Sequence, residues 1–317
     1  MESKSKDNST VKKDVLEHIP LSEVRREKLR MLARRMKELT KAVMKNRMGA
    51  AGVFILSFFV LLAIFGPLVA PYEVDATVLG QFEPKLLPSD EHWMGTDSMG
   101  MDIFSELLCG ARVSIIVGIF AAMIAAGLGA AVGLYSGYVG GWKDEVLMRF
   151  NDILLSIPWL VLMILIAGML GTINLTIIIL IIGLTGWSGT ARLVRAQVMS
   201  IRERMYVERA RAIGAEDLHI IKVHVMPNCF PLIFANTILT VAISILSEAT
   251  LSFLRMRPQD TVTWGTMLSD AFNSSAFNLG LHAWIVMPGL CIVFLVLGFT
   301  LLGYALDEAL NPRLRKR

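Results

Sequence analysis

The sequence has little charge for its length. Only 18% of the 317 residues are Asp, Glu, Lys or Arg, whereas 54% are hydrophobic and the mean hydropathy is +0.58. Soluble domains carry about 25% charged residues. This shortage excludes an ordinary soluble globular protein and predicts that a lipid bilayer surrounds much of the chain.

Several short motifs are also missing. The chain contains no Gly-Lys dipeptide, which excludes a Walker A phosphate loop, so any ATP must be bound by another chain. It contains neither a His-Glu-x-x-His helix nor a Gly-x-Ser-x-Gly elbow, and its five histidines are scattered. The three cysteines stand singly, at spacings that suit neither a zinc site nor a disulfide framework. We therefore expect no catalytic residue, cofactor or metal in this chain and predict that it is not an enzyme.

What the sequence does contain is long apolar stretches. A helix needs about 20 apolar residues to cross the hydrocarbon of a bilayer. Six candidate stretches run over residues 49–69, 113–135, 153–170, 175–191, 229–253 and 283–305. A short turn at residues 171–174 separates the third stretch from the fourth, which predicts a helical hairpin. The sequence thus predicts an all-α polytopic membrane protein with about six transmembrane helices.

Lys and Arg residues are distributed unevenly between the loops. If the chain begins inside, 27 of the 31 fall in inner segments, and the outer segments hold only Lys85, Arg112, Arg255 and Arg257. Positively charged loops stay on the cytoplasmic side of a membrane. We therefore expect both termini in the cytoplasm. This rule also explains the basic residues without a nucleic acid partner.

These observations divide the chain into segments. In order they are a cytoplasmic tail (1–48), a first transmembrane helix (49–70), an extracytoplasmic loop (71–111), a five-helix core (112–310) with an inner loop (192–227) and an outer loop (254–282), and a basic cytoplasmic tail (311–317). Residues 1–20 are expected to be disordered, and residues 21–47 to form a basic amphipathic helix on the inner leaflet or a solvated lead-in without a partner. The two outer loops should fold over the outer mouth, where a soluble partner could dock.

The inner loop over residues 192–227 is the most informative segment. Its pattern predicts a short helix over residues 207–213, a chain reversal at Gly214, and a second helix from about Glu216 that ends near Pro227. Glycine readily adopts the positive φ with which a chain reverses after a helix. Acidic residues suit the first turn of the helix that follows.

Small residues on the first of these helices suggest a protein contact. Ala210 and Ala212 beside Glu208 would form a knob for a groove in another protein, although spacing alone favours an ordinary linker. The motif Glu-Arg-Ala-x-x-x-Gly at residues 208–214, followed by Met-Pro at 226–227, resembles the EAA loop of ABC-importer permeases. In that family the loop is the coupling element that sits in a cleft of the ATPase subunit.

The resemblance extends from about residue 45 to the end of the chain. The further segments that resemble the second permease of dipeptide and oligopeptide importers are His92-Trp93-Met94-Gly95-Thr96-Asp97, Gly110-Ala111-Arg112, Gly140-Gly141-Trp142, Asp144-Glu145, Gly186-Trp187, Arg192-Leu193-Val194-Arg195, Leu246-Ser247-Glu248-Ala249, Leu251-Ser252-Phe253-Leu254, Trp264-Gly265 and Asn311-Pro312-Arg313.

This resemblance implies a type I ABC-importer permease fold in a prokaryotic cell membrane. The chain would form the translocation path with a second homologous permease and work by alternating access. Two ATP-binding subunits, which hold ATP and Mg, and an extracytoplasmic substrate-binding protein would complete the importer. The residues expected to couple the chain to the ATPases are Glu208, Ala210, Ala212, Gly214 and Ala215. Peptide is the expected cargo, and nickel or glutathione, which relatives in this group carry, are the alternatives.

The chain departs from the family pattern mainly on the outer side. Met101 stands where the family usually has a basic residue, and Arg255 and Arg257 lie near family glycines. On the inner side, Arg209 replaces the middle alanine of the EAA motif. We therefore expect the outer loops to differ from those of relatives in docking surface or cargo path.

Three other features have both a functional and a structural interpretation. Glu248, near the outer end of the fifth stretch, either lines the path or outer gate or is a helix-end acid bonded to a neighbouring loop; we favour the second. Gly129 and Gly133 favour close helix packing over pore lining. Asp97 and Asp102 lack the alternating ligands of a calcium loop and predict turns.

Two rival classes of function stay open at this point. A self-sufficient secondary transporter or channel predicts coupling-ion residues at mid-membrane and inverted repeats with broken helices, whereas these stretches hold almost no charge and no evident repeat. An assembly or scaffold protein without transport needs neither small-residue helices nor a shaped inner loop. We rank both below the importer permease.

Overall fold

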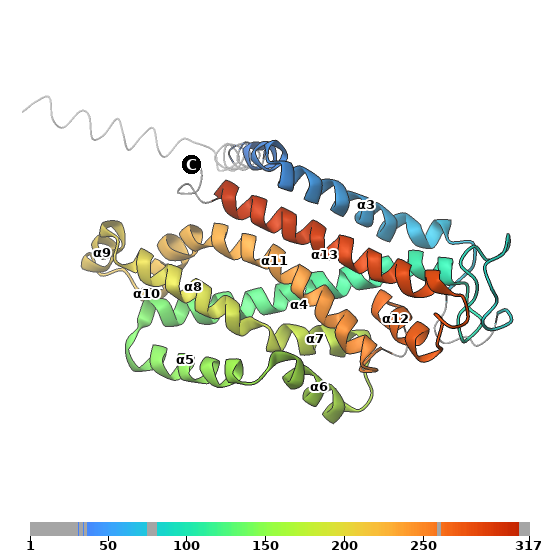
Figure 1. Ribbon diagram of the computed structural model, residues 1–317. Helices are drawn as coiled ribbons and strands as arrows, with labels where there is room; N and C mark the ends of the chain where they lie inside the picture. Colours follow the sequence, from blue (N-terminus) through green and yellow to red (C-terminus); the bar gives the residue numbers. More distant parts are fainter. Residues whose placement is uncertain (1–30, 32–33, 35–36, 75–80, 259–260, 311–317) are drawn as a thin grey trace, which may run out of the picture.

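The computed structural model describes residues 31, 34, 37–74, 81–258 and 261–310, which form an elongated helical bundle (Figure 1). The predicted disordered tail, most of the amphipathic helix and the C-terminal tail lie outside these residues. The helices are α3 (Arg47–Val69), α4 (Ile103–Val139), α5 (Gly141–Ser156), α6 (Trp159–Leu170), α7 (Leu175–Thr185), α8 (Trp187–Arg202), α9 (Met205–Ala212), α10 (Asp217–Ile220), the π-helix η1 (Ile221–Val225), α11 (Met226–Phe253), α12 (Trp264–Asn273) and α13 (His282–Leu310).

Five helices in the described part of the chain are long and apolar enough to cross a membrane. They are Arg47–Val69, Ile103–Val139, Leu175–Arg202, Asp217–Phe253 and His282–Leu310. The bent pair of α5 and α6 gives a sixth if it is counted as one span. The prediction of an all-α protein with about six transmembrane helices is confirmed.

The third predicted stretch is not a straight helix. The axes of α5 and α6 differ by 86° across the break that separates them. Pro158 explains this break, because a proline ring disfavours the helical conformation for the preceding residue. Ile157 is accordingly extended, with φ −87° and ψ 128°. The apolar stretch was predicted correctly, but its conformation was not.

The second span begins earlier than its apolar stretch predicts. Asp102 caps the N-terminus of α4, because its Oδ2 accepts a hydrogen bond of 2.8 Å from the backbone N–H of Ser105. Asp97 Oδ1 accepts hydrogen bonds from the backbone N–H groups of Met99 (2.8 Å) and Met101 (2.7 Å). Both carboxylates therefore serve a turn or a cap, which confirms the interpretation of this pair as turn chemistry.

Glycines allow α4 and α8 to pack closely along much of their length. A Cβ atom added to Gly133 would lie 2.6 Å from the carbonyl oxygen of Ala191 and 2.8 Å from Cβ of Val194. One added to Gly129 would lie 2.7 Å from the carbonyl oxygen of Trp187. These positions have no room for a side chain, so the predicted role of Gly129 and Gly133 in packing is confirmed.

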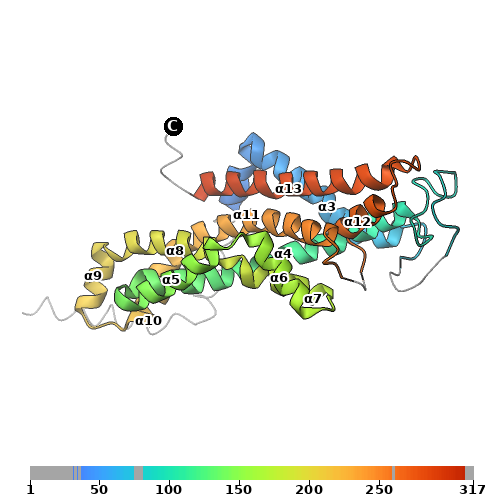
Figure 2. The same ribbon diagram turned by 60° about the horizontal axis from the view of Figure 1, so that its bottom comes forward.

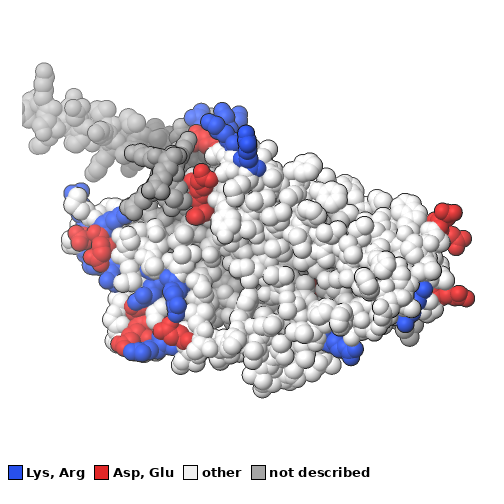
Figure 3. Space-filling view, viewed as in Figure 1, with Lys and Arg blue, Asp and Glu red and all other residues white. Residues whose placement is uncertain are grey.

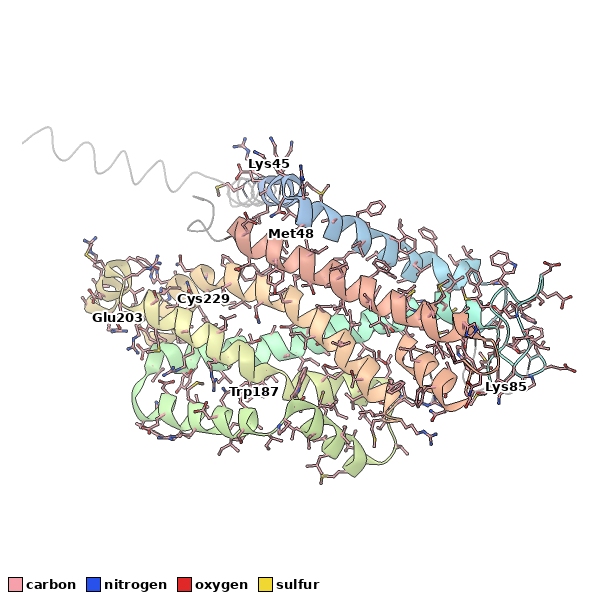
Figure 4. The ribbon with its side chains drawn as sticks, viewed as in Figure 1. Lys45, Met48, Lys85, Trp187, Glu203 and Cys229 are labelled. Carbon is pink, nitrogen blue, oxygen red and sulfur yellow. The ribbon has the colours of Figure 1, made fainter. Side chains whose placement is uncertain are left out.

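Charged residues gather at the two ends of the bundle and leave a broad uncharged band between them (Figure 3). The first residues of α3, the last residues of α13 and helix α9 lie at one end, where most of the visible Lys and Arg residues are found (Figures 1 and 3). Glu203 lies at this end and Lys85 at the other (Figure 4). The bias of positive charge makes the α9 end the cytoplasmic one, in agreement with the predicted orientation.

Candidate functional site

Helix α9 projects from the inner end of the bundle (Figure 2). Its Val207 is fully buried and its Ala210 is 7% exposed. Both pack into a hydrophobic group that we call the inner cluster, which consists of Leu134, Tyr138, Val194, Val198, Ile201, Val207, Ala210, Ile220, Ile221, Val225 and Cys229. Helices α4, α8, α10, η1 and α11 also contribute to this cluster, so α9 packs into a core that five other helices build.

Gly214 ends α9 in a defined reversal. Its φ is +83°, and no atom lies within 4 Å of the position that a Cβ would take. The N–H of Gly214 donates to the carbonyl oxygen of Arg211 (3.0 Å), and the N–H of Ala215 donates to that of Ala210 (3.2 Å). This pair of bonds is a Schellman motif, whose reversing residue is usually glycine. The predicted chain reversal at Gly214 is confirmed.

The structure brings the five predicted coupling residues together at the inner tip. Glu208, Ala212 and Gly214 are exposed, and Ala215 is half-buried. Ala210 instead faces the inner cluster. The expected knob of Ala210 and Ala212 is therefore wrong for Ala210, because a short helix must bury one face to stay attached to the bundle.

Large apolar side chains at the tip were missed from the sequence. Ile213 is 86% exposed, Met205 69% and Leu218 58%. Each occurs singly among charged residues, so no periodic pattern marked it. The sequence nevertheless contains one signal of exposure. Ile213 stands directly before the reversing Gly214 in a polar loop, which offers it few apolar neighbours.

The second helix of the inner loop does not end near Pro227, as was expected. Helices α10, η1 and α11 follow one another without a break from Asp217 to Phe253. A proline ring inside an α-helix clashes with the carbonyl four residues earlier. The π-helix η1, whose turns are wider than those of an α-helix, directly precedes Pro227. Such turns occur where a continuous helix is locally irregular. The prediction failed because proline was taken as a stop signal.

Two ion pairs connect α5 to α8 near this end. Arg195 forms a bidentate pair with Asp144, with both N–O distances at 2.6 Å, and its side chain is 28% exposed. Arg192 pairs with Asp152 at 2.6 Å in a more exposed position. On α9, the guanidinium of Arg211 lies over the ring of Tyr138, 5.3 Å from its centroid. The bidentate geometry makes the pair of Asp144 and Arg195 the strongest of these connections.

Glu248 lies in the outer half of α11 and is 1% exposed. Its Oε1 accepts hydrogen bonds from the hydroxyls of Ser252 (2.8 Å) and Thr263 (2.7 Å). Thr263 is also the N-cap of α12. The carboxylate therefore joins the end of α11 to the start of α12, a contact of the kind that the structural interpretation describes. A role in gating stays a prediction.

Polar and apolar residues together line a cavity of about 320 Å³ at the outer end of the bundle, which we call the outer cavity. Met101, Arg255 and Arg257, the three outer departures from the family pattern, all line it. Burial raises the pKa of Asp97, another wall residue, although its bonds from the backbone of Met101 and Met99 oppose this effect. The three residues at which we expect the outer side to depart from the family pattern therefore lie in one place.

Comparison with known proteins gives the family. The model for binding-protein-dependent transport system inner membrane components matches residues 114–316. The chain belongs to this family. A second model, for the N-terminal TM domain of oligopeptide transport permease C, matches residues 36–88. This permease is therefore a multi-pass inner membrane subunit of an ABC importer, with a role in transport rather than catalysis.

Individual relatives agree with this assignment. The permease is 37% identical to the dipeptide transport system permease protein DppC of Bacillus subtilis over 274 residues, 86% of this chain and 84% of that protein. It is 36% identical to the oligopeptide transport system permease protein OppC of the same organism, over 86% of this chain and 87% of that protein. It is 33% identical to the glutathione transport system permease protein GsiD of Pectobacterium atrosepticum, over 84% and 87%.

A solved structure supports the fold. The permease resembles a chain of the MetNI methionine ABC transporter in an inward-facing conformation, with a TM-score of 0.54 and 17% identity. The similarity covers 65% of this chain and 96% of the other. The type I importer permease fold that the resemblance implied is confirmed.

Proposed function

We propose that the permease forms the translocation path of an ATP-driven peptide importer together with a second homologous permease. Two ATP-binding subunits, which hold ATP and Mg, dock at the inner end, and an extracytoplasmic substrate-binding protein docks at the outer end. Support for a peptide cargo comes from the names of the relatives, two of which are dipeptide and oligopeptide permeases. Glutathione is the second candidate, since a glutathione permease is also similar. A nickel cargo has less support.

Helix α9 is the observation that carries the proposed coupling. It presents Glu208 and the exposed Ile213 to the cytoplasm while Val207 and Ala210 hold it to the inner cluster. A partner that binds the exposed face therefore pulls on the inner cluster, to which five other helices of the bundle contribute. ATP binding would close the two ATPases and shift the paired permeases between inward-open and outward-open states, because the closed ATPases bind one state better than the other.

The first test is the set of chains that accompanies the permease. We expect a C-terminally tagged permease, solubilised gently, to retain two ATP-binding chains and a second permease, as identified by mass spectrometry. A permease that purifies alone and moves solute into liposomes without ATP would contradict the proposal and favour a self-sufficient carrier.

The second test is Gly214→Asp. Asp at a φ of +83° disturbs the Schellman reversal without any clash, because the position is open. We expect normal insertion into the membrane but loss of peptide uptake coupled to ATP hydrolysis. Gly171→Asp is a matched control, since Gly171 also has a positive φ (+75°) and open space but lies between α6 and α7, away from α9. Normal uptake by Gly214→Asp would refute the role of α9.

A further inference from the structure

The outer cavity contains a carboxylate that has no partner in the described part of the chain. Glu106 lies one turn into α4, lines the cavity and is 6% exposed. Among the described residues its carboxylate takes part in no hydrogen bond or ion pair. Two more polar atoms of residues in the same wall, Oγ1 of Thr261 and Nε1 of Trp284, also have no hydrogen-bond partner in the described chain. Buried polar groups are normally satisfied, so such a concentration indicates an occupant.

The other charged groups of the cavity are already engaged. Arg257 donates to Oδ2 of Asp270 at 2.5 Å, and Arg255 donates to Oδ1 of Asn273 at 2.7 Å. Asp97 accepts two hydrogen bonds from the backbone. Among the charged wall residues of the described chain, Glu106 alone lacks a hydrogen-bond or ion-pair partner, and a carboxylate this buried is stable in its charged form only beside a cation.

The arrangement of the walls narrows the kind of cation. The described residues include no group of three or more side chains that could hold a metal ion, so the carboxylates do not converge on one point. A ligand that brings its own hydrogen-bond donors suits a single carboxylate better, and an ammonium group brings three. The walls also include Met99, Met101 and Met267. Methionine side chains adapt to irregular shapes, so these walls would tolerate different side chains next to the charge.

We propose that the outer cavity binds a primary ammonium group and that the amino terminus of a peptide cargo supplies it. This inference rests on the proposed function, which provides the cargo. Glu106 accepts hydrogen bonds from the ammonium group, and the methionines contact the first side chain of the peptide without selecting one. The volume of about 320 Å³ is sufficient for one amino-terminal residue. The cavity thus recognises the feature that all unmodified peptides share.

The test measures binding to the full-length permease in lipid nanodiscs. The probe is alaninamide, which carries the ammonium group and a following carbonyl, and N-acetylalaninamide is the control that lacks the charge. We expect saturation-transfer NMR to detect alaninamide but not N-acetylalaninamide. Glu106→Gln should weaken alaninamide binding by at least about tenfold, because it removes the charge from the acceptor. Glu91→Gln, a change at an exposed acid outside the cavity, should leave binding unchanged.

A second variant keeps the test decisive if Glu106→Gln does not fold. Met99 is 39% exposed at the wall of the cavity, so Met99→Trp fills the space without altering the carboxylate. We expect it to abolish alaninamide binding even if Glu106→Gln does not accumulate in the membrane. Equal binding of alaninamide by the unaltered permease and both variants would overturn the inference.

Two further outcomes identify other occupants. Absence of alaninamide binding to the unaltered permease would overturn the inference and leave ordered water as the partner of Glu106. Tighter binding of Nα-acetyllysinamide than of alaninamide would also overturn it, because the source would then be a lysine side chain. Peptide uptake by cells is scored in parallel: no uptake contradicts the proposed function, whereas normal uptake without alaninamide binding contradicts this inference alone.

Discussion

Replacement of Gly133 by alanine tests whether α4 and α8 must pack without a gap. The added Cβ would lie 2.6 Å from the carbonyl oxygen of Ala191 and 2.8 Å from Cβ of Val194. A backbone carbonyl cannot rotate away as the end of a flexible side chain can, so the two helices must separate. Overpacking of this kind costs about 1 to 3 kcal/mol. Alanine is favoured over glycine in helices by about 1 kcal/mol, which offsets part of that cost.

Gly127 provides the matched control. It lies on the same helix, it is exposed, and no atom lies within 4 Å of its added Cβ. We expect Gly127→Ala to keep or raise the thermal unfolding midpoint in detergent and Gly133→Ala to lower it by a few degrees. The measurement is thermal unfolding followed by light scattering or intrinsic fluorescence. If Gly133→Ala is as stable as Gly127→Ala, the reasoning from close packing is refuted.

Three further changes test individual contacts by thermal unfolding. Glu248→Gln should be tolerated because an amide oxygen can still accept from Thr263, whereas Glu248→Leu should destabilise by about 1 to 3 kcal/mol; equal effects would contradict the hydrogen-bond role. A double-mutant cycle to alanine at Asp144 and Arg195 should give a coupling of about 1 kcal/mol, and additivity would disprove the pair. Because burial raises the pKa of Asp97, this group favours folding at acidic pH and loses that contribution as pH rises through its folded pKa. As the pH rises above about 4, the usual pKa of an aspartate, Asp97→Asn should therefore gain stability relative to the unaltered chain, and the opposite trend would argue against the shift.

The membrane spans were predictable because bilayer crossing leaves a composition signal that needs no tertiary information. The same composition signal carries no information on the backbone conformation within an apolar stretch. It did not predict the 86° bend between α5 and α6, although Pro158 was visible, and it placed the start of α4 too late. Helix starts depend on caps, and Asp102 caps α4 outside the apolar stretch.

The chain reversal of the inner loop was predictable from the sequence, but the surface that α9 exposes was not. Gly214 was identified correctly because a positive φ requires a particular residue type. The inward direction of Ala210 and the exposure of Ile213 depend on which face of α9 meets the inner cluster, and a helix of two turns is too short to show a periodicity. The outer cavity could not be predicted from the sequence, because Glu106 and Arg257 line the same cavity only through the packing of α4 against the segments that follow α11.

Helix α4 provides a continuous connection between the two ends of the permease. It carries Glu106 in its first turn, at the outer cavity, and Tyr138 in its last, within the inner cluster that holds α9. Its 37 residues span about 55 Å as a single helix. A displacement of α9 would therefore reach the cavity through one rigid element, provided that α4 and α8 move together. Gly133 lies between these ends, so Gly133→Ala should also lower the peptide taken up per ATP hydrolysed, whereas Gly127→Ala should not. Unchanged coupling in a destabilised Gly133→Ala permease would show that the signal travels through the continuous helix of α10, η1 and α11 instead.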